Sequence, residues 1–134
     1  MSRGEIQFVD RARQLNSFKD LTFGKITPTD IDGLIEYKDK AYIFIEVKYK
    51  DKDLPFGQRL ALERLIRDTP KHKKSISIVC EHCVEDTEIQ VNVANCKVRE
   101  LYLYNELKWR PPNELITVKE LVDLFINIMV DGVF

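Results

Sequence analysis

The segment Ala-Tyr-Ile-Phe-Ile-Glu-Val-Lys-Tyr, residues 41–49, places two opposite charges at the end of an apolar run. Its first five residues are nearly all apolar, which is typical of a strand that is covered on both faces. Glu46 and Lys48 follow, and side chains two residues apart in a strand point to the same face. Because a buried charge is costly unless it is paired or binds a metal, this acid and this base indicate either an ion pair or a chemical site.

The run before this segment brings a second acid to the same place. Residues 31–37 are also β-rich, and the tripeptide Lys38-Asp39-Lys40 separates the two runs, which predicts a hairpin. If the loop has three residues, Asp32 lies directly opposite Glu46. Opposed residues share one face of a sheet with Cβ atoms about 5 Å apart, and a shift of one residue would move Asp32 to the other face. The predicted proximity of the two carboxylates therefore depends on the loop length.

Two carboxylates and an amine at one position suit a divalent cation and a phosphate. A bound Mg²⁺ removes the repulsion between carboxylates, prefers oxygen ligands and keeps waters that can attack phosphate. A lysine beside it can position or deprotonate a water and offset charge that develops on phosphoryl oxygens. A pair of carboxylates alone could serve glycoside chemistry. The lysine and the basic residues around it favour phosphate.

The sequence Thr-Pro-Thr-Asp-Ile-Asp-Gly at residues 27–33, followed by Ile-Glu-Val-Lys at 45–48, resembles the PD-(D/E)XK nuclease superfamily. The motif of that superfamily is an acid at the start of one strand and (D/E)-x-K at the end of the next. The resemblance covers residues 27–80. It implies an α/β fold with a mixed central β-sheet flanked by helices, in a restriction-endonuclease-like core. It also implies hydrolysis of nucleic-acid phosphodiester bonds with Mg²⁺ or Mn²⁺, with DNA favoured over RNA.

The same resemblance assigns roles to individual residues. Asp32 and Glu46 would bind the metal, and the backbone carbonyl of Val47 would add a ligand. Lys48 would orient the attacking water. Gln58, on the helix that follows, matches a polar residue that many members of the superfamily place near the site.

Two assignments stay open at this point. The proline of the motif is not followed directly by an acid, so Asp30 is the alternative to Asp32 as the first metal ligand. The hairpin register would put Asp30 opposite Lys48, although Asp30 is equally well explained as a turn residue. Glu5 is the candidate for the acid that some members carry on their first helix, and is otherwise a solvated helix residue.

The apolar spacing and the capping signals predict the remaining elements. We expect helices over 5–15, 53–68 and 117–129, and strands over 75–80, 88–93 and 98–104. Asp53 is expected to cap the second helix, and Thr117 with Glu120 forms a capping box for the third. The order strand, helix, strand over residues 41–80 predicts a right-handed crossover and a parallel pairing. These elements together predict a mixed sheet with flanking helices.

The composition permits a phosphate-bearing partner without requiring one. The net charge is −1, from 21 basic and 22 acidic residues, whereas a strongly basic chain would indicate nucleic acid directly. Exposed turns explain the cluster at residues 71–74 as well as phosphate contacts do. The basic residues that we consider for contacts with nucleic acid are Lys50, Lys52, Arg59, Lys71, Lys73 and Lys74.

The length of 134 residues fits a single domain, residues 1–134, around one core. No apolar run is long enough to cross a membrane, and we expect no secretory signal. The three cysteines are an odd number and predict reduced thiols in a cytoplasmic protein without a membrane partner. The cluster Cys80, His82, Cys83 and Cys96 has one half of a zinc motif, but no second ligand lies close to Cys96 in the sequence.

Two other functions are compatible with these patterns. One is a protein of nuclease fold that binds nucleic acid or a protein partner without cutting. The other is a plain interaction module whose charges are solvated. A homodimer is among the arrangements that the sequence allows, and substrate structure, endo- or exonuclease action and sequence specificity are not predicted by it.

Overall fold

A mixed five-stranded β-sheet forms the centre of the computed structural model, which describes residues 17–132. The strands lie in the order β1-β2-β3-β4-β5, where β2 and β3 are parallel and all other neighbours are antiparallel. The hairpin of β1 with β2 and the parallel pairing of β2 with β3 were predicted from the sequence. The strand bounds are β1 Gly33–Tyr37, β2 Ala41–Tyr49, β3 Lys74–His82, β4 Lys97–Leu103 and β5 Trp109–Arg110.

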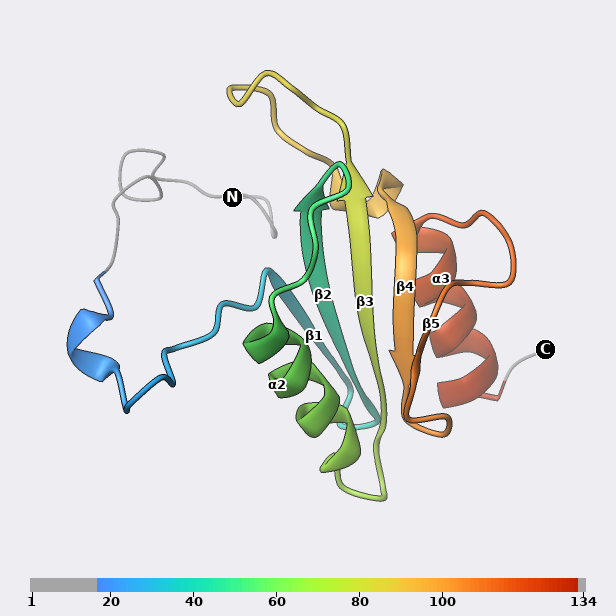
Figure 1. The fold of residues 1–134 in the computed structure, drawn as a ribbon. Coiled ribbons are helices and arrows are strands. Elements are labelled where there is room, and N and C mark those ends of the chain that lie inside the picture. Colours follow the sequence, from blue (N-terminus) through green and yellow to red (C-terminus); the bar gives the residue numbers. More distant parts are fainter. Residues whose placement is uncertain (1–16, 133–134) are drawn as a thin grey trace.

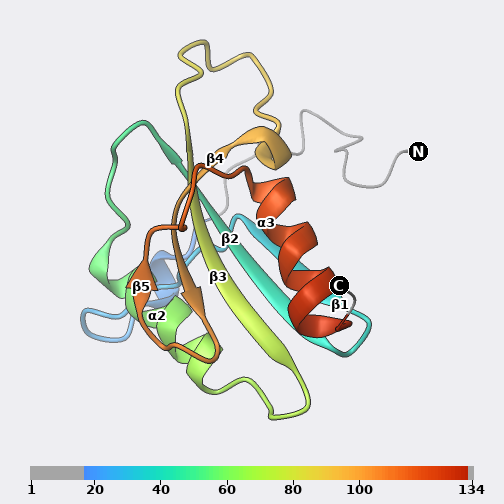
Figure 2. The ribbon, with the colours of Figure 1, turned by 90° about the vertical axis from the view of Figure 1, so that its right-hand side faces the viewer.

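Helices cover the sheet on both faces, so that the protein has three layers (Figures 1 and 2). Helix α2, Phe56–Arg67, covers one face, and α3, Val118–Leu124, covers the other. The last turns of α3 continue as a π-helix, η3, Phe125–Val130. Two short 3-10 helices, η1 Lys19–Leu21 and η2 Val93–Asn95, complete the regular elements.

The hairpin β1-β2 has the predicted three-residue loop. Tyr37 pairs with Ala41, and the Lys40 N–H donates to the Tyr37 carbonyl at 2.7 Å. Lys38 and Asp39 in the loop take positive φ values of 49° and 59°, which reverses the chain within a short distance. The register therefore runs as predicted from the loop to Gly33 opposite Ile45, and the next position along is Asp32 opposite Glu46.

Because side chains alternate between the two faces of each strand, the sheet has a separate hydrophobic core on each face. Ile43, Ile78 and Leu101 point to the α3 side, where they pack with Val118 and Phe125 in the larger cluster. The smaller cluster lies under α2 and consists of Phe44, Leu54, Leu62, Ile66, Val79 and Tyr102. Glu46 and Lys48 differ from Phe44 by an even number of residues, so they share its face and lie on the α2 side. The site is thus built between the sheet and α2.

Helix α2 begins at Phe56, and the expectation that it starts at Asp53 with an aspartate cap is wrong. Pro55 occupies the N-cap position in an extended conformation, and no side chain caps the helix. A proline disfavours helical geometry in the residue before it, so Leu54 cannot belong to the helix. Leu54 instead packs in the smaller core with 5% of its surface exposed.

The expected strand over residues 88–93 is also wrong, because local hydrogen bonds form a loop there. The Asp86 side chain accepts from the Glu88 N–H at 3.0 Å, and the Ile89 N–H donates to the Asp86 carbonyl at 3.1 Å. The Asn92 side chain accepts from Ala94 N–H at 3.2 Å and starts η2. Asp and Asn side chains compete with sheet pairing in this way, although the sequence alternates like a strand.

The capping box at Thr117 and Glu120 is confirmed, and α3 begins at the next residue. The change to a π-helix at Phe125 was not predicted, and Phe125 lies in the core with 2% exposure. The helix expected over residues 5–15, and Glu5 with it, lies outside the described residues.

Candidate active site

Asp32 and Glu46 are joined where β1 begins. The Asp32 N–H donates to Oε1 of Glu46 at 3.1 Å, and Oδ2 of Asp32 accepts from the Val47 N–H at 2.8 Å. The hairpin register creates this arrangement, because it places Asp32 one position beyond the last ladder pair. The two carboxyl groups predicted to meet are therefore close together on the α2 side.

Glu46 is the most deeply buried acid of the site, with 1% of its surface exposed. The pKa of this carboxyl is raised from 4.5 to about 7, chiefly by burial and also by the negative charge of Asp32. The Asp32 N–H and the Lys48 ammonium oppose these two effects, since both favour the ionised form. A nearby carboxylate and burial both disfavour the ionised form, and a cation bound between the two carboxyl groups would favour it.

Gln58 connects the helix to both charged residues of β2. Its amide nitrogen donates to Oε2 of Glu46 in a short hydrogen bond and to the Asp30 carbonyl at 2.9 Å. Its amide oxygen accepts from Nζ of Lys48 at 3.3 Å, and that Nζ lies 4.0 Å from Oε2 of Glu46. The sequence predicted that Gln58 faces the sheet near the site, and the structure places it there.

Asp30 does not lie opposite Lys48, because the ladder of β1 ends at Gly33. Its side chain is exposed, and its backbone carbonyl is the group that contacts the site. Of the two acids considered for the first ligand, Asp32 is the one whose carboxylate lies beside Glu46.

The backbone of Val47 presents a further oxygen to the same edge. Its N–H donates to Asp32, and the N–H and C=O of one strand residue point to the same neighbouring strand. The Val47 carbonyl therefore faces the side on which Asp32 lies, as the resemblance implies for a third ligand.

These groups fit a small divalent cation of the Mg²⁺ type. Within residues 17–132, no group of three or more His, Cys, Asp or Glu side chains is arranged to hold a metal. A cation bound here would have only two carboxylate ligands, from Asp32 and Glu46, and its other ligands would be a backbone carbonyl and waters. Mg²⁺ is commonly held by one or two carboxylates and retains several waters, so the donor set matches this ion. The described cysteines are all free thiols, and Cys80 and Cys96 are buried.

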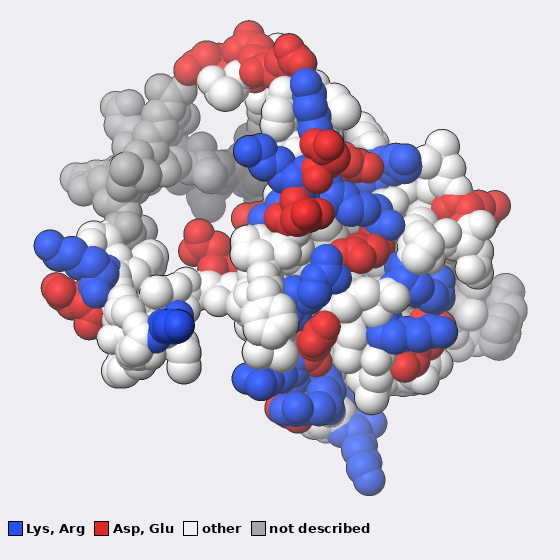
Figure 3. Space-filling view, in the orientation of Figure 1, with Lys and Arg blue, Asp and Glu red and all other residues white. Residues whose placement is uncertain are grey.

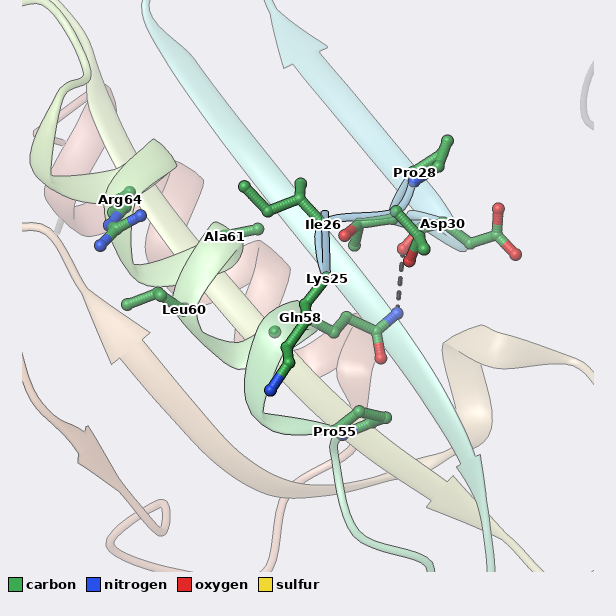
Figure 4. Close-up of a pocket in the computed structure, with 12 residues that line it drawn as sticks. Lys25, Ile26, Pro28, Asp30, Pro55, Gln58, Leu60, Ala61 and Arg64 are labelled. Atoms are coloured by element: carbon green, nitrogen blue, oxygen red, sulfur yellow. Dashed lines mark hydrogen bonds between the residues drawn. The ribbon is translucent and has the colours of Figure 1, made fainter. Parts of the chain in front are cut away.

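A pocket of about 580 Å³ opens beside Gln58, between residues 25–30 and the start of α2 (Figure 4). Gln58 points from the helix toward Asp30 across one end of the pocket. Lys25 and Arg64 supply two basic side chains to its lining, and neither forms an ion pair with any described residue. Arg64 lies at the end of the pocket away from Gln58, and Asp32, Glu46 and Lys48 are not among the residues that line it.

Lys25 and Arg64 were not among the residues expected from the sequence. Arg64 follows Gln58 and Ala61 at intervals of three, and residues three apart are neighbours on a helix surface. That spacing could have identified it. Nothing in the sequence places Lys25, because the segment that carries it has no periodic pattern.

The basic residues near the end of β2 have other contacts. Lys50 lies in a turn and pairs with Glu85 at 2.8 Å, while Lys52 is exposed. Arg59 pairs with Glu100 at 2.5 Å and lies 4.7 Å from the ring centre of Trp109. Charges neutralised in this way are less available to phosphate groups.

The basic cluster at residues 71–74 lies at the other end of the sheet, because Lys74 pairs with Ala41 at the start of β2. Lys73 contacts Glu36 at 3.0 Å and Asp39 at 3.1 Å, and Lys74 donates to the Met129 carbonyl. Lys71 is exposed. The structure does not bring Lys71, Lys73 or Lys74 to the site.

No known family model matches the sequence, and neither curated proteins nor solved structures give a match. In the part of the chain that the structure describes, every helix is too short or too polar to span a bilayer.

Proposed function

We propose that this protein is a metal-dependent nuclease of the PD-(D/E)XK type, with a restriction-endonuclease-like core, which hydrolyses phosphodiester bonds of nucleic acid. DNA is the favoured substrate, and Mg²⁺ or Mn²⁺ is the cofactor. The observation that carries the proposal is the burial of Glu46 beside Asp32, with Lys48 and Gln58 in contact around it.

A plain surface ion pair does not account for this arrangement. Surface pairs need little support from other groups and contribute about 0–1 kcal/mol. Here the amide of Gln58 bonds to both members of the Glu46–Lys48 pair, and the backbone of β1 bonds to the acid. Holding an acid almost completely buried near a second acid costs stability, and such costs are typical of functional sites.

Each side chain has a distinct part in the proposed reaction. Asp32 and Glu46, with the Val47 carbonyl, would hold the metal, which polarises the phosphate and makes its bound water more acidic. Lys48 reaches the same space with 19% of its side chain exposed, so its ammonium can orient a water or offset charge on a phosphoryl oxygen. Gln58 fixes Lys48 through its amide oxygen and Glu46 through its amide nitrogen.

The distribution of surface charge supports a nucleic-acid substrate whose phosphates contact the protein at a few basic residues. On the face seen in Figure 3, basic and acidic side chains are interspersed and do not form one broad basic surface. Lys25 and Arg64 are basic groups of the pocket that Gln58 borders. We infer that phosphates of the strand to be cut contact these two residues.

A cleavage assay with Mg²⁺ and with Mn²⁺ tests the proposal. Supercoiled plasmid, linear duplex, single strands and a branched junction are offered to the native protein, to Lys48→Ala and to Lys119→Ala. Lys119 pairs with Asp123 on α3 and is the matched control, since its pair lies far from the site. We expect metal-dependent cutting that Lys48→Ala loses and Lys119→Ala keeps. Equal cutting by the native protein and Lys48→Ala would refute the proposal.

A second candidate, a protein of the same fold that binds a partner or nucleic acid without cutting, is favoured by a different observation. The edge strand β1 exposes Leu34 and Ile35, at 55% and 37%, and the preceding Ile26 is 71% exposed. Apolar surface of this kind is typical of protein interfaces, including a homodimer. Binding of nucleic acid or self-association without any metal-dependent cutting would support this candidate.

A further inference from the structure

A β-bulge in β4 places two consecutive charged residues on the face of the site. Val79 pairs with Glu100, but the next residue of β3, Cys80, pairs with Val98, so Arg99 is an extra residue in β4. Side chains normally alternate between faces. Glu100 lies on the α2 side because it pairs with Val79. Arg99, as the extra residue, also reaches that side, where it contacts Glu81 at 3.5 Å. Bulges re-aim side chains in this way and are frequent next to active sites.

The guanidinium of Arg99 is bonded to the loop that connects β2 with α2. It donates to the carbonyl of Lys52 at 2.5 Å and to the carbonyl of Lys50 at 2.5 Å. This loop begins two residues after Lys48 and leads to α2, whose third residue is Gln58. Arg99 therefore holds the segment between the two elements that carry the site.

The neighbouring Glu100 makes the second attachment. Its carboxylate accepts from Arg59 at 2.5 Å, and Arg59 directly follows Gln58 in the first turn of α2. That turn has no side-chain cap, so attachments from β4 take the place of a cap in fixing its position. The bulge thus ties both the loop and the helix start to one strand.

We propose that Arg99 is a positioning residue of the site, which sets the distance between Gln58 and the Glu46–Lys48 pair by holding the carbonyls of Lys50 and Lys52. The relevance of Arg99 to catalysis rests on the proposed function, but its effect on the position of Gln58 does not depend on that function. Without Arg99, the loop loses two charge-assisted hydrogen bonds, each stronger than a neutral one. The start of α2 then moves relative to β2, and the contacts of Gln58 weaken while the core stays intact.

Arg110 provides a matched control on the adjacent strand. It bonds to Glu106 at 2.6 Å and to the Pro111 carbonyl at 3.2 Å, and its side chain is 27% exposed, compared with 23% for Arg99. The variants are Arg99→Ala, Arg99→Lys and Arg110→Ala. Nuclear magnetic resonance without metal follows the side-chain amide protons of Gln58, assigned with Gln58→Ala, and the exchange of the Lys50 and Lys52 backbone amides. Calorimetry then measures binding of Mn²⁺ alone.

We expect Arg99→Ala to shift the Gln58 amide protons and to speed exchange of the loop amides by about tenfold. Affinity for Mn²⁺ should fall by about tenfold, as for other residues that orient ligands. Arg99→Lys should recover part of each effect, since an ammonium can reach one carbonyl, and Arg110→Ala should change none of them.

Gln58 signals and loop exchange that are the same in Arg99→Ala and Arg110→Ala would overturn the proposal. If Arg99→Ala does not fold, Arg99→Lys compared with Arg110→Lys decides in the same way. A native protein that binds no Mn²⁺ would refute the proposed function, while the resonance measurements would still decide the role of Arg99.

Discussion

The backbone N–H of Asp32 donates to Oε1 of Glu46 at 3.1 Å, and this bond joins two acids that are 14 residues apart in the chain. It follows from one feature of the sequence, the three-residue loop of the hairpin. It also has a cost, because it holds a carboxylate close to an acid that is almost fully buried.

Glu46→Gln should stabilise the metal-free protein at high pH. The folded protein holds the proton of Glu46 up to a pKa of about 7, whereas the unfolded chain releases it near 4.5. The folded state therefore binds more protons between these values, and stability falls as pH rises through this window and is constant above it. The glutamine does not ionise, so the free energy of unfolding at pH 8 should rise by roughly 2–3 kcal/mol, with little change at pH 4.5.

Urea denaturation at pH 4.5 and pH 8 measures this difference, with Glu85→Gln as the control because Glu85 is exposed and pairs only with Lys50 among the described residues. A gain that is the same at both pH values would show that Glu46 is not held protonated by its surroundings.

Lys48→Ala and Gln58→Ala should separate catalysis from metal binding. Removal of Lys48 deletes the group that orients water, so the cleavage rate should fall on the order of 10²-fold or more. Affinity for Mn²⁺ should not fall, because a positive charge 4.0 Å from Glu46 is lost. Gln58→Ala should lower both, since Glu46 loses a hydrogen bond and Lys48 loses its partner. Single-turnover cleavage and calorimetry measure the two effects, and Lys48→Ala that cuts normally would exclude the assigned role.

Lys25→Ala and Arg64→Ala should weaken binding of DNA and lower its dependence on salt. Each variant removes one phosphate contact, so the slope of log affinity against log salt should fall by about 1. Lys73→Ala should leave DNA binding unchanged and lower stability instead, because its side chain is 8% exposed between Glu36 and the ring of Tyr42. Fluorescence anisotropy at several salt concentrations tests the three variants. A larger loss for Lys73→Ala than for the other two would place the substrate at the opposite end of the sheet.

The two helix starts should respond differently to the loss of a polar side chain. Thr117→Ala removes the hydroxyl that accepts from the Glu120 N–H and should cost about 1 kcal/mol of unfolding free energy, although the Glu120 side chain can still accept from the backbone N–H of residue 117. Asp53→Ala should change stability by less than about 0.5 kcal/mol, because Asp53 caps no helix. Thermal denaturation of both variants measures this. A cost for Asp53→Ala equal to that for Thr117→Ala would mean that α2 starts earlier than Phe56.

Local signals in the sequence explain why much of the site was predictable. The loop at residues 38–40 determines the register, and the register together with the period of two along β2 brings Asp32, Glu46 and Lys48 to one face. The capping box at Thr117 is local as well. These features depend on residues close to one another in the chain, which is where sequence patterns carry most information.

The parts that could not be predicted depend on contacts between distant segments. The bulge at Arg99 arises from the pairing of β4 with β3. The amide oxygen and the amide nitrogen of Gln58 reach Lys48 and Glu46 only because α2 packs over β2. At residues 88–93, side-chain hydrogen bonds from Asp86 and Asn92 override an alternating pattern. At Asp53, the conformation of Pro55 decides where the helix begins.

Titration of the protein with Mn²⁺ by calorimetry at pH 5.5 and pH 8 tests the central claim, that Asp32 and Glu46 hold a divalent metal. We predict one Mn²⁺ for each chain, with affinity higher at pH 8 by on the order of tenfold because Glu46 must lose its proton. Asp32→Asn should abolish binding, whereas Asp39→Asn, in the exposed hairpin loop, should not. No binding by the native protein, or equal binding by Asp32→Asn, would contradict the claim.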